Sequence, residues 1–451
     1  MIQKNNLNLF LKRENQNKNT QKRKERLALN LLYRFFSFIF MTVAVLTGCS
    51  GNMQTLPDLI VRHSKDMDFT KLPLGGQKSD EEAMVEVLSG VYSKALKANA
   101  ADSPELLEYV IDSLGSRGYV AVDWENQVDM ENGELALAFC TAVEQRRDAE
   151  LTILSVAYNG EFRTYDIKSR QGHVEVVRTY YRFDKNGALE YDNQVRYFPG
   201  VWEYTEEGYL IFEGSYYTDE NYILTYSDTL EHVALRILPL DKTCRELNRK
   251  YILPIGYSKN NLLLTDWSEQ DFGELDFYDL FERFFTMLYG HPSPCIPDAD
   301  VNTGVIYQIP ASVFEYVTGA YLKADRRILV AKGILLSEDG MYLYKPRGFY
   351  EGEYPDIPYP EVTEYTENQD GTITLTVNAV YPEENTSRAF SHRTVIRPLS
   401  EEDFQYVSNE MILPEKAYDY WWHSNRLTEE AWQDLYGGNI LWKQYNMLND
   451  Y

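Results

Sequence analysis

The sequence is poor in cysteine, in histidine and in basic residues. It has four Cys and six His in 451 residues, and so few cysteines cannot build a disulfide scaffold. The 69 acidic residues outnumber the 44 basic ones and give a net charge of −25. Nucleic-acid binders gain most of their affinity from Lys and Arg that neutralise phosphates. We therefore exclude a nucleic-acid partner.

The common catalytic motifs are also missing. The sequence contains no Gly-x-Ser-x-Gly, Ser-x-x-Lys, His-Glu-x-x-His, Cys-x-x-Cys, Gly-x-Gly-x-x-Gly or P-loop. The nearest metal motif runs from Asp298 to Gly304, but its sixth position is Thr303 and its twelfth is Ile309. Calcium loops require Gly and Glu there. We interpret it as an acidic turn and expect neither a metal nor another cofactor.

The first 48 residues have the pattern of an export signal. Nine basic residues and two acidic ones occur in residues 1–34, and residues 35–47 (FFSFIFMTVAVLT) carry no charge. At about 1.5 Å per residue this apolar run reaches only about 20 Å, short of the ~30 Å hydrocarbon core of a bilayer. A basic segment, a short apolar run and small residues predict a secretory signal peptide.

The residues Leu46-Thr47-Gly48-Cys49 make this signal more specific. They resemble the lipobox of bacterial lipoproteins, in which the Cys receives a diacylglyceryl group and becomes the mature N-terminus. Cys49 is thus the expected lipidation site, because two acyl chains suffice for stable anchoring. Removal of residues 1–48 leaves a net charge of −32, which anionic lipid repels. We expect a protein held by acyl chains outside the cell membrane.

The remainder alternates between helical and strand patterns. A capping box at residues 79–82 opens one predicted helix, Ser103-Pro104 opens a second, and residues 130–147 form a third. From Glu150 onward the apolar period becomes two, and the runs are separated by turn signals such as Asn186-Gly187. Short strands in series predict an antiparallel β-meander packed on helices, hence an α+β fold.

An internal repeat suggests two copies of this unit. Residues 199–206 (PGVWEYTE) return as residues 360–367 (PEVTEYTE), with six matches in eight. Further matches follow in the same order. We therefore predict four segments, which are the signal peptide at 1–48, a tether at 49–78, and α+β repeats at 79–268 and 269–451.

One block carries a resemblance to a known family. Residues 248–257 (NRKYILPIGY) and 265–279 (TDWSEQDFGELDFYD) are similar to an uncharacterised lipoprotein family of Gram-positive gut bacteria. The resemblance implies the same envelope location. It supplies no catalytic residue, because the family has no assigned activity.

Three cysteines remain beside Cys49, and they allow at most one disulfide. Cys140 and Cys244 fall on the apolar faces of predicted helices, where a buried structural role is favoured. Cys295 follows His291 in a proline-rich stretch. We interpret that stretch as a linker rather than a metal site.

Repeated polar residues offer the remaining candidates for a site. His232 and Arg236 recur as His392 and Arg397, either as a duplicated polar site or, as we favour, as satisfied residues at strand edges. Four acids offer acid–base pairs for a glycan hydrolase. They are Glu203, Glu206, Glu364 and Glu367.

Aromatic residues are abundant, with 36 Tyr, 20 Phe and 7 Trp, and the densest group is Trp421-Trp422-His423. Tyrosine suits half-buried sheet faces and stacks on sugars, so we expect it mainly to cover exposed sheet. Our leading hypothesis is a non-catalytic envelope lipoprotein that binds a protein or glycan partner. A glycan hydrolase is the alternative. A solute-binding protein is disfavoured, because it needs alternating β-α-β units.

Overall fold

The computed structural model describes most of the chain between residues 104 and 437, and a few residues on either side of that range. The residues described are 88–89, 91–92, 104–128, 130–157, 160–184, 186–215, 230–296, 304–334, 336–347, 356–412, 423–437 and 441–444. All of them belong to one compact unit. The expected signal peptide, Cys49 and the tether lie outside the described residues, as do Asp298 and the pair Trp421-Trp422.

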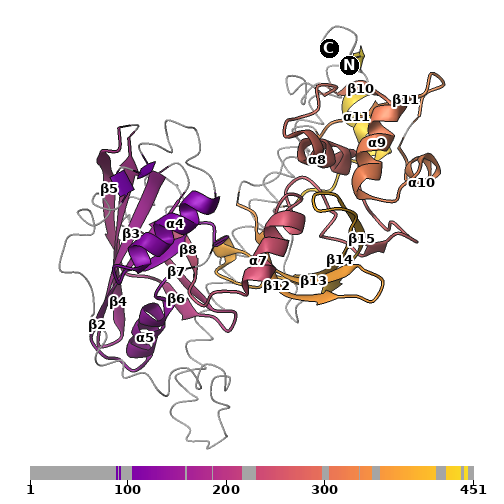
Figure 1. The fold of residues 1–451 in the computed structure, drawn as a ribbon. Helices are drawn as coiled ribbons and strands as arrows, with labels where there is room; N and C mark the ends of the chain where they lie inside the picture. The colour runs from indigo at the N-terminus through magenta and orange to yellow at the C-terminus, as the bar shows by residue number, and fades with distance from the viewer. Residues whose placement is uncertain are drawn as a thin grey trace, which may run out of the picture. The chain divides into compact units, whose positions relative to one another are not determined.

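A five-stranded sheet occupies the first half, with strand order β1-β2-β3-β4-β5. The β1–β2 pair is parallel and the other pairs are antiparallel. Its elements are α4 (Pro104–Gly115), β1 (Val120–Asp123), α5 (Gly133–Glu144), β2 (Ala149–Val156), β3 (Glu161–Arg170), β4 (His173–Phe183) and β5 (Leu189–Tyr197). Figure 1 shows α4 and α5 beside these strands. The two helices contact both β2 and β1.

The two faces of this sheet form separate cores because side chains alternate along each strand. Leu154 and Phe162 pack with Val110 of α4 on one face, whereas Ile153 and Tyr165 belong to the other core. That second core also receives α5 and a three-stranded antiparallel sheet. The strands of this small sheet are β6 (Val201–Tyr204), β7 (Tyr209–Ser215) and β8 (Leu230–Arg236).

The small sheet has a second apolar face. Leu210 and Phe212 lie in the first-half core, while Tyr209 and Ile211 pack with Val380 of the second half. A short helix α7 (Lys242–Leu247) and a π-helical turn η3 (Asn248–Ile252) follow β8.

The second half contains a five-stranded sheet, ordered β12-β13-β14-β15-β9, and a three-stranded sheet, ordered β11-β10-β16. The strands are β9 (Trp267–Ser268), β10 (Val305–Pro310), β11 (Met341–Tyr344), β12 (Tyr359–Glu367), β13 (Ile373–Val380), β14 (Ser391–Pro398), β15 (Phe404–Ile412) and β16 (Leu441–Gln444). The helices are α8 (Phe277–Tyr289), α9 (Ala311–Tyr321), α10 (Arg326–Ala331), the turn η6 (Pro382–Glu384) and α11 (Glu429–Tyr436). One large core unites α8, α9 and both sheets.

The predicted α+β class is confirmed. The predicted helices at 104–114 and 130–147 are α4 and α5, and the strand pattern at residues 173–183 is β4. Leu88 and Tyr92 of the first predicted helix are helical and buried. No helix among the described residues has both the length and the apolar character to cross a membrane.

The tandem repeat stays a prediction. Its strongest matches fall on β6 and β12, and β7 and β8 follow β6 as β13 and β14 follow β12. Beyond these strands the elements differ, because Asn248 begins η3 whereas Asn409 lies in β15. Likewise Thr265 precedes β9, and its match Thr428 caps α11.

Many tyrosines are buried rather than placed on exposed sheet, contrary to the expectation. Eight tyrosines are among the largest fully buried side chains, namely Tyr92, Tyr165, Tyr209, Tyr257, Tyr307, Tyr342, Tyr344 and Tyr406. For these residues the expectation of a surface role is wrong. The physical reason is that the large apolar ring of tyrosine gains from burial, and a hydroxyl can find a partner inside; Tyr406, for example, donates to the Tyr251 carbonyl at 2.7 Å.

The predicted burial of the helical cysteines is confirmed. Cys140 lies in α5 and Cys244 in α7, and both are buried free thiols. Cys295 is also buried and free. Burial raises the pKa of each thiol, that of Cys140 to about 12, which leaves them protonated and unreactive at neutral pH.

Candidate functional site

The loop that follows β1, residues 124–128, is shaped by one buried carboxylate. Asp123 accepts hydrogen bonds from the backbone N–H groups of Glu125 (2.9 Å), Gln127 (2.6 Å) and Val128 (3.0 Å). Burial raises the pKa of Asp123, although these three N–H groups oppose the rise. Asn126 has φ 57°, a left-handed conformation that Asn tolerates better than most residues.

The Asn126 side chain connects this loop to two distant strands. Its Nδ2 donates to the Ala234 carbonyl at 3.1 Å and to the Tyr359 hydroxyl at 2.9 Å. Its Oδ1 accepts from the Arg236 backbone N–H at 2.9 Å. A single amide therefore fixes the loop against β8 and β12.

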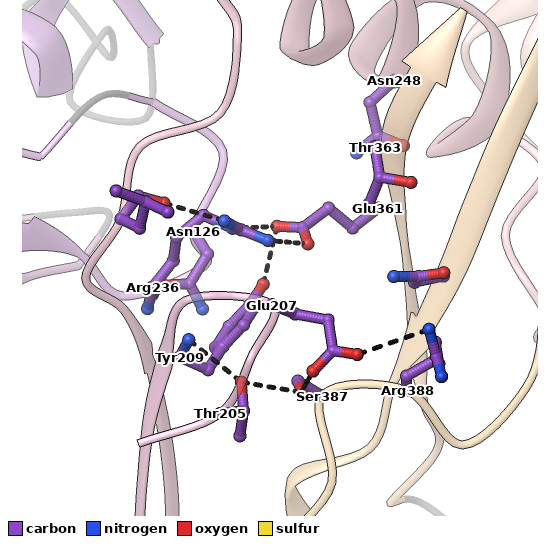
Figure 2. Close-up of polar contacts among 12 residues, drawn as sticks. Asn126, Thr205, Glu207, Tyr209, Arg236, Asn248, Glu361, Thr363, Ser387 and Arg388 are labelled. Carbon is purple, nitrogen blue, oxygen red and sulfur yellow. Dashed lines mark hydrogen bonds and ion pairs between the residues drawn. The ribbon is translucent and has the colours of Figure 1, made fainter. Parts of the chain in front are cut away.

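A buried ion pair lies next to this amide, between β8 and β12. The Arg236 guanidinium donates from Nε and Nη2 to the two oxygens of Glu361, and the Tyr209 hydroxyl donates to Glu361 Oε1 at 2.7 Å. Figure 2 shows Arg236 and Tyr209 pointing toward Glu361 from neighbouring strands. Arg236 and Glu361 side chains are each only 5% exposed.

The pKa shifts of Arg236, Tyr209 and Tyr359 keep each of these three groups protonated. Burial by itself lowers the pKa of Arg236, but Tyr209 and Glu361 outweigh that effect and raise it overall. Burial, followed by the Glu361 charge, raises the pKa of Tyr209 and of Tyr359. Both phenols therefore stay protonated and available as donors.

Figure 2 also shows a second set of polar contacts, which centres on Glu207. Ser387 Oγ donates to Glu207 Oε2 at 2.8 Å and approaches Thr205 Oγ1 at 3.0 Å. Arg388 forms an ion pair with Glu207 at 3.6 Å. These contacts join the turn between β6 and β7 to the segment before β14.

A pocket of about 250 Å³ opens beside the 124–128 loop, and we call it the junction pocket. It is lined by Trp124, Glu125, Asn126, Gln127, His232, Val233, Ala234, Leu235, Leu253, Tyr359 and Pro382. Apolar walls with a few placed polar groups are typical of small-molecule sites.

His232 is the imidazole ring that lines this pocket. Its Nδ1 lies 3.4 Å from Glu213 Oε2 and its Nε2 lies 3.4 Å from Glu383 Oε2. When protonated it would bridge strand β7 and the turn η6.

The comparison with known families gives one result. Residues 76–426 match the model of a family of unknown function, DUF6070. The chain belongs to the DUF6070 family. It matches no curated protein and no solved structure. Every residue of the junction pocket lies within the DUF6070 match, so the pocket is part of the family domain.

The repeated polar residues of this DUF6070 chain do not form a duplicated site. His232 and Arg236 lie on β8, which is an edge strand, as expected. His392 lies on β14, between two other strands, and is fully buried, so the expectation of an edge position is wrong for it. Arg397 pairs with Glu269 at 2.5 Å rather than with a counterpart of Glu361.

The four acids proposed for glycan hydrolysis are exposed on the DUF6070 surface. They are Glu203, Glu206, Glu364 and Glu367. None of them lines the junction pocket. An exposed carboxylate lacks the enclosed environment that tunes a catalytic acid, so the paired-acid mechanism has no support at these positions.

A second pocket, of about 240 Å³, lies at the N-terminal end of α8. Asp276 caps this helix and pairs with Arg426 at 3.2 Å. Arg426 and Arg347 both bind Asp279. Burial, then the Asp279 charge, raises the pKa of Asp276 to about 6. These charges are paired with one another, which favours a structural role.

No metal centre emerges among the described residues, which contain no group of three or more His, Cys, Asp or Glu able to hold an ion. His291 is exposed and its Nδ1 contacts the Pro292 carbonyl oxygen at 2.9 Å. Cys295 is buried. The acidic turn that begins at Asp298 lies outside the described residues.

Sequence reasoning missed most of the junction pocket. Trp124, Asn126, Gln127 and Tyr359 were not predicted as site residues. One signal was present, because a mostly polar run (DWENQ) begins at Asp123, the last residue of an apolar strand. Polar residues after a buried strand are a usual place for binding groups.

Proposed function

We propose that this protein is a lipid-anchored protein of the cell envelope whose junction pocket binds a small ligand without catalysis. The junction pocket is the observation that carries the binding part. It offers two aromatic rings, from Trp124 and Tyr359, beside the polar side chains of Glu125 and His232. Rings and polar groups together suit a polar ligand with one apolar face, such as a sugar unit.

The surrounding contacts support a pocket that is formed before the ligand arrives. The Asp123 bonds fix the loop backbone, and the Asn126 bonds fix it against β8 and β12. A preorganised site loses little freedom when it binds.

The envelope location rests on the sequence alone. The basic segment, the apolar run and Cys49 motivate it. The anchor would keep the DUF6070 domain outside the membrane, where envelope sugars and peptides are the available ligands.

A pocket-filling variant tests the binding proposal. The full-length chain, purified in detergent, would be screened by thermal shift and calorimetry against envelope monosaccharides, disaccharides and short peptides. Leu253 lines the pocket and is half-buried, so Leu253→Trp should abolish binding of any hit. Leu264→Trp is the matched control, because Leu264 is equally half-buried but packs elsewhere.

Two results would contradict the proposal. One is a hit whose affinity is equal in the wild-type chain and in Leu253→Trp. The other is turnover of the ligand that persists after repurification, which would make the protein an enzyme.

A further inference from the structure

The junction pocket has walls that carry charge of one sign. Among the described residues that line it, none is Lys or Arg, whereas Glu125 contributes a carboxylate. A cleft lined by charge of one sign raises the local concentration of ligands of the opposite sign. The lining therefore favours a cation over an anion.

The Glu125 carboxylate is available to a ligand. The backbone N–H of Glu125 donates to Asp123, and its carbonyl accepts from the Gln127 side chain. Its carboxylate, however, forms no hydrogen bond or ion pair with the described part of the chain. Glu125 lines the pocket and is also exposed. Its carboxylate therefore lies where the pocket opens to solvent.

The electrostatic surroundings of Glu125 are also negative. Partial burial of its carboxylate, followed by the Asp123 charge, raises the pKa of Glu125, and no cation of the described chain counters this rise. Two guanidinium groups of the same region act on other carboxylates, Arg249 on Asp123 and Arg163 on Glu231. The charge of Glu125 is thus left for a ligand to neutralise.

His232 does not reverse the charge of the pocket. Its Nδ1 lies 3.4 Å from Glu213 Oε2, and its Nε2 lies 3.4 Å from Glu383 Oε2. A proton gained by this ring would therefore face a carboxylate at each nitrogen. The imidazole is consequently a poor binding group for an anion.

The Tyr359 ring is the second group that suits a cation. Its hydroxyl accepts from Asn126 Nδ2 at 2.9 Å and lies 3.4 Å from the Tyr209 hydroxyl, which fixes the phenol in place. The ring lines the pocket and contacts no cation or other ring among the described residues. Trp124, by contrast, already carries Arg163 over its ring. Aromatic rings attract ammonium groups through the cation–π interaction.

We propose that the ligand of the junction pocket is a small organic cation, whose ammonium group pairs with Glu125 beside the Tyr359 ring. The volume of about 250 Å³ admits a molecule as small as choline or a single amino sugar. A neutral ligand would leave the Glu125 carboxylate without a partner, and an anion would be repelled by it. This inference rests on the proposed function, because it specifies the charge of the ligand.

Calorimetry on the full-length chain in detergent, at pH 7 and constant ionic strength, tests the proposal. Choline would be compared with the uncharged dimethylbutanol in which carbon replaces its nitrogen, and glucosamine would be compared with N-acetylglucosamine. We expect saturable binding of at least one of the two cations. Its neutral counterpart should bind at least about fivefold more weakly, as a cation–π contact and an exposed ion pair together imply.

Glu125→Gln removes the charge and keeps the shape of the side chain. It should weaken binding of the cation at least about threefold and leave binding of the neutral counterpart unchanged. Because Glu125 is exposed, this variant should fold, and the comparison of each cation with its neutral counterpart needs no variant at all. Glu134→Gln is the matched control, since Glu134 is exposed but does not line the pocket.

The outcomes separate this inference from the proposed function. The inference is overturned if neither cation binds, if a neutral counterpart binds as tightly as its cation, or if Glu125→Gln keeps the wild-type affinity for the cation. In each of these cases a neutral ligand whose binding is lost in Leu253→Trp would still support the proposed function. A cation that binds Leu253→Trp as tightly as the wild-type chain would contradict both.

Discussion

Glu361 is the residue on which the buried polar contacts near the junction pocket converge. Its carboxylate accepts from Arg236 and from Tyr209, and it is almost fully buried. Removing one partner of a buried ion pair leaves an uncompensated charge, which typically costs about 3–5 kcal/mol. The ion pair therefore affects stability mainly because the loss of one partner would leave the other charge buried and uncompensated.

We predict that Glu361→Gln lowers the free energy of unfolding by about 3 kcal/mol or more, because Arg236 keeps its charge in a buried place. Chemical denaturation followed by circular dichroism would measure this loss. Glu364→Gln is the control, since Glu364 is exposed on the same strand and should change stability by less than about 0.5 kcal/mol. Equal effects of the two substitutions would show that the ion pair does not contribute as described.

His392 is held neutral in the centre of the second-half sheet. Its Nδ1 lies 2.9 Å from Thr394 Oγ1, and that hydroxyl donates to Asn409 Oδ1 at 2.8 Å. The hydroxyl proton is thus used, so Nδ1 is the donor and Nε2 accepts from the Tyr257 hydroxyl at 3.0 Å. Burial lowers the pKa of His392 to about 3.

This lowered pKa predicts a pH dependence of stability. Below pH 6.5 the unfolded chain protonates this His while the native chain does not, so the stability contributed by His392 is present above pH 6.5 and is lost as the pH falls toward 3. Between pH 7 and pH 5 the loss should be about 2 kcal/mol. Denaturation of the His392→Gln variant should show a correspondingly smaller loss than the wild-type chain. His291→Gln, at an exposed position, should retain the wild-type dependence, and an unchanged slope in His392→Gln would refute the assignment.

At the scale of elements, the 124–128 loop is the part on which the junction pocket depends. Three backbone N–H groups of the loop point at the Asp123 carboxylate, and two of them, from Gln127 and Val128, share Oδ2. We predict that Asp123→Asn loosens the loop. The Asn amide nitrogen, whether it takes the place of Oδ1 or of Oδ2, would face a backbone N–H donor instead of accepting from it.

Hydrogen exchange would measure this effect, with faster exchange expected for residues 124–128 in Asp123→Asn and a loss of stability of about 1–3 kcal/mol. Asp148→Asn is a suitable control, since the Asp148 carboxylate accepts an exposed bond from the Gln171 N–H. Unchanged exchange in the loop would mean that the carboxylate does not organise it.

The elements themselves were largely predictable from the sequence. Period-two runs such as residues 173–183 gave β4 with its bounds, and Pro104 marked the start of α4, because local patterning and capping decide these features. The pairing of elements was less accessible. Asn126 and Tyr359 are 233 positions apart, and no local pattern in either segment predicts their contact.

The same limit explains the errors at single residues. His232 and His392 look equivalent in sequence, yet one lies on an edge strand and the other between two strands. Their surroundings differ because strand order is a tertiary property. Tyrosine burial was missed for a similar reason, since the packing of each ring into a core depends on tertiary contacts that composition does not reveal.

At the scale of the whole molecule, we propose that a lipid anchor at Cys49 holds the DUF6070 domain at the cell envelope. We predict that a cell grown with a fatty-acid probe incorporates it into the wild-type chain and not into Cys49→Ala, because Cys49 is the only thiol in the lipobox-like sequence. In-gel detection of the probe and membrane fractionation would measure this. Cys140→Ala, which changes a buried thiol, should stay labelled. Equal labelling of the wild-type chain and Cys49→Ala, or a wild-type chain free in the cytosol, would contradict the anchor.

The binding role is tested most directly by native mass spectrometry of the full-length chain isolated in detergent from its own cells. We predict that the wild-type chain carries a small-molecule adduct, which Leu264→Trp retains and Leu253→Trp lacks. An adduct that persists in Leu253→Trp, or a wild-type chain that carries none, would contradict a ligand in the junction pocket.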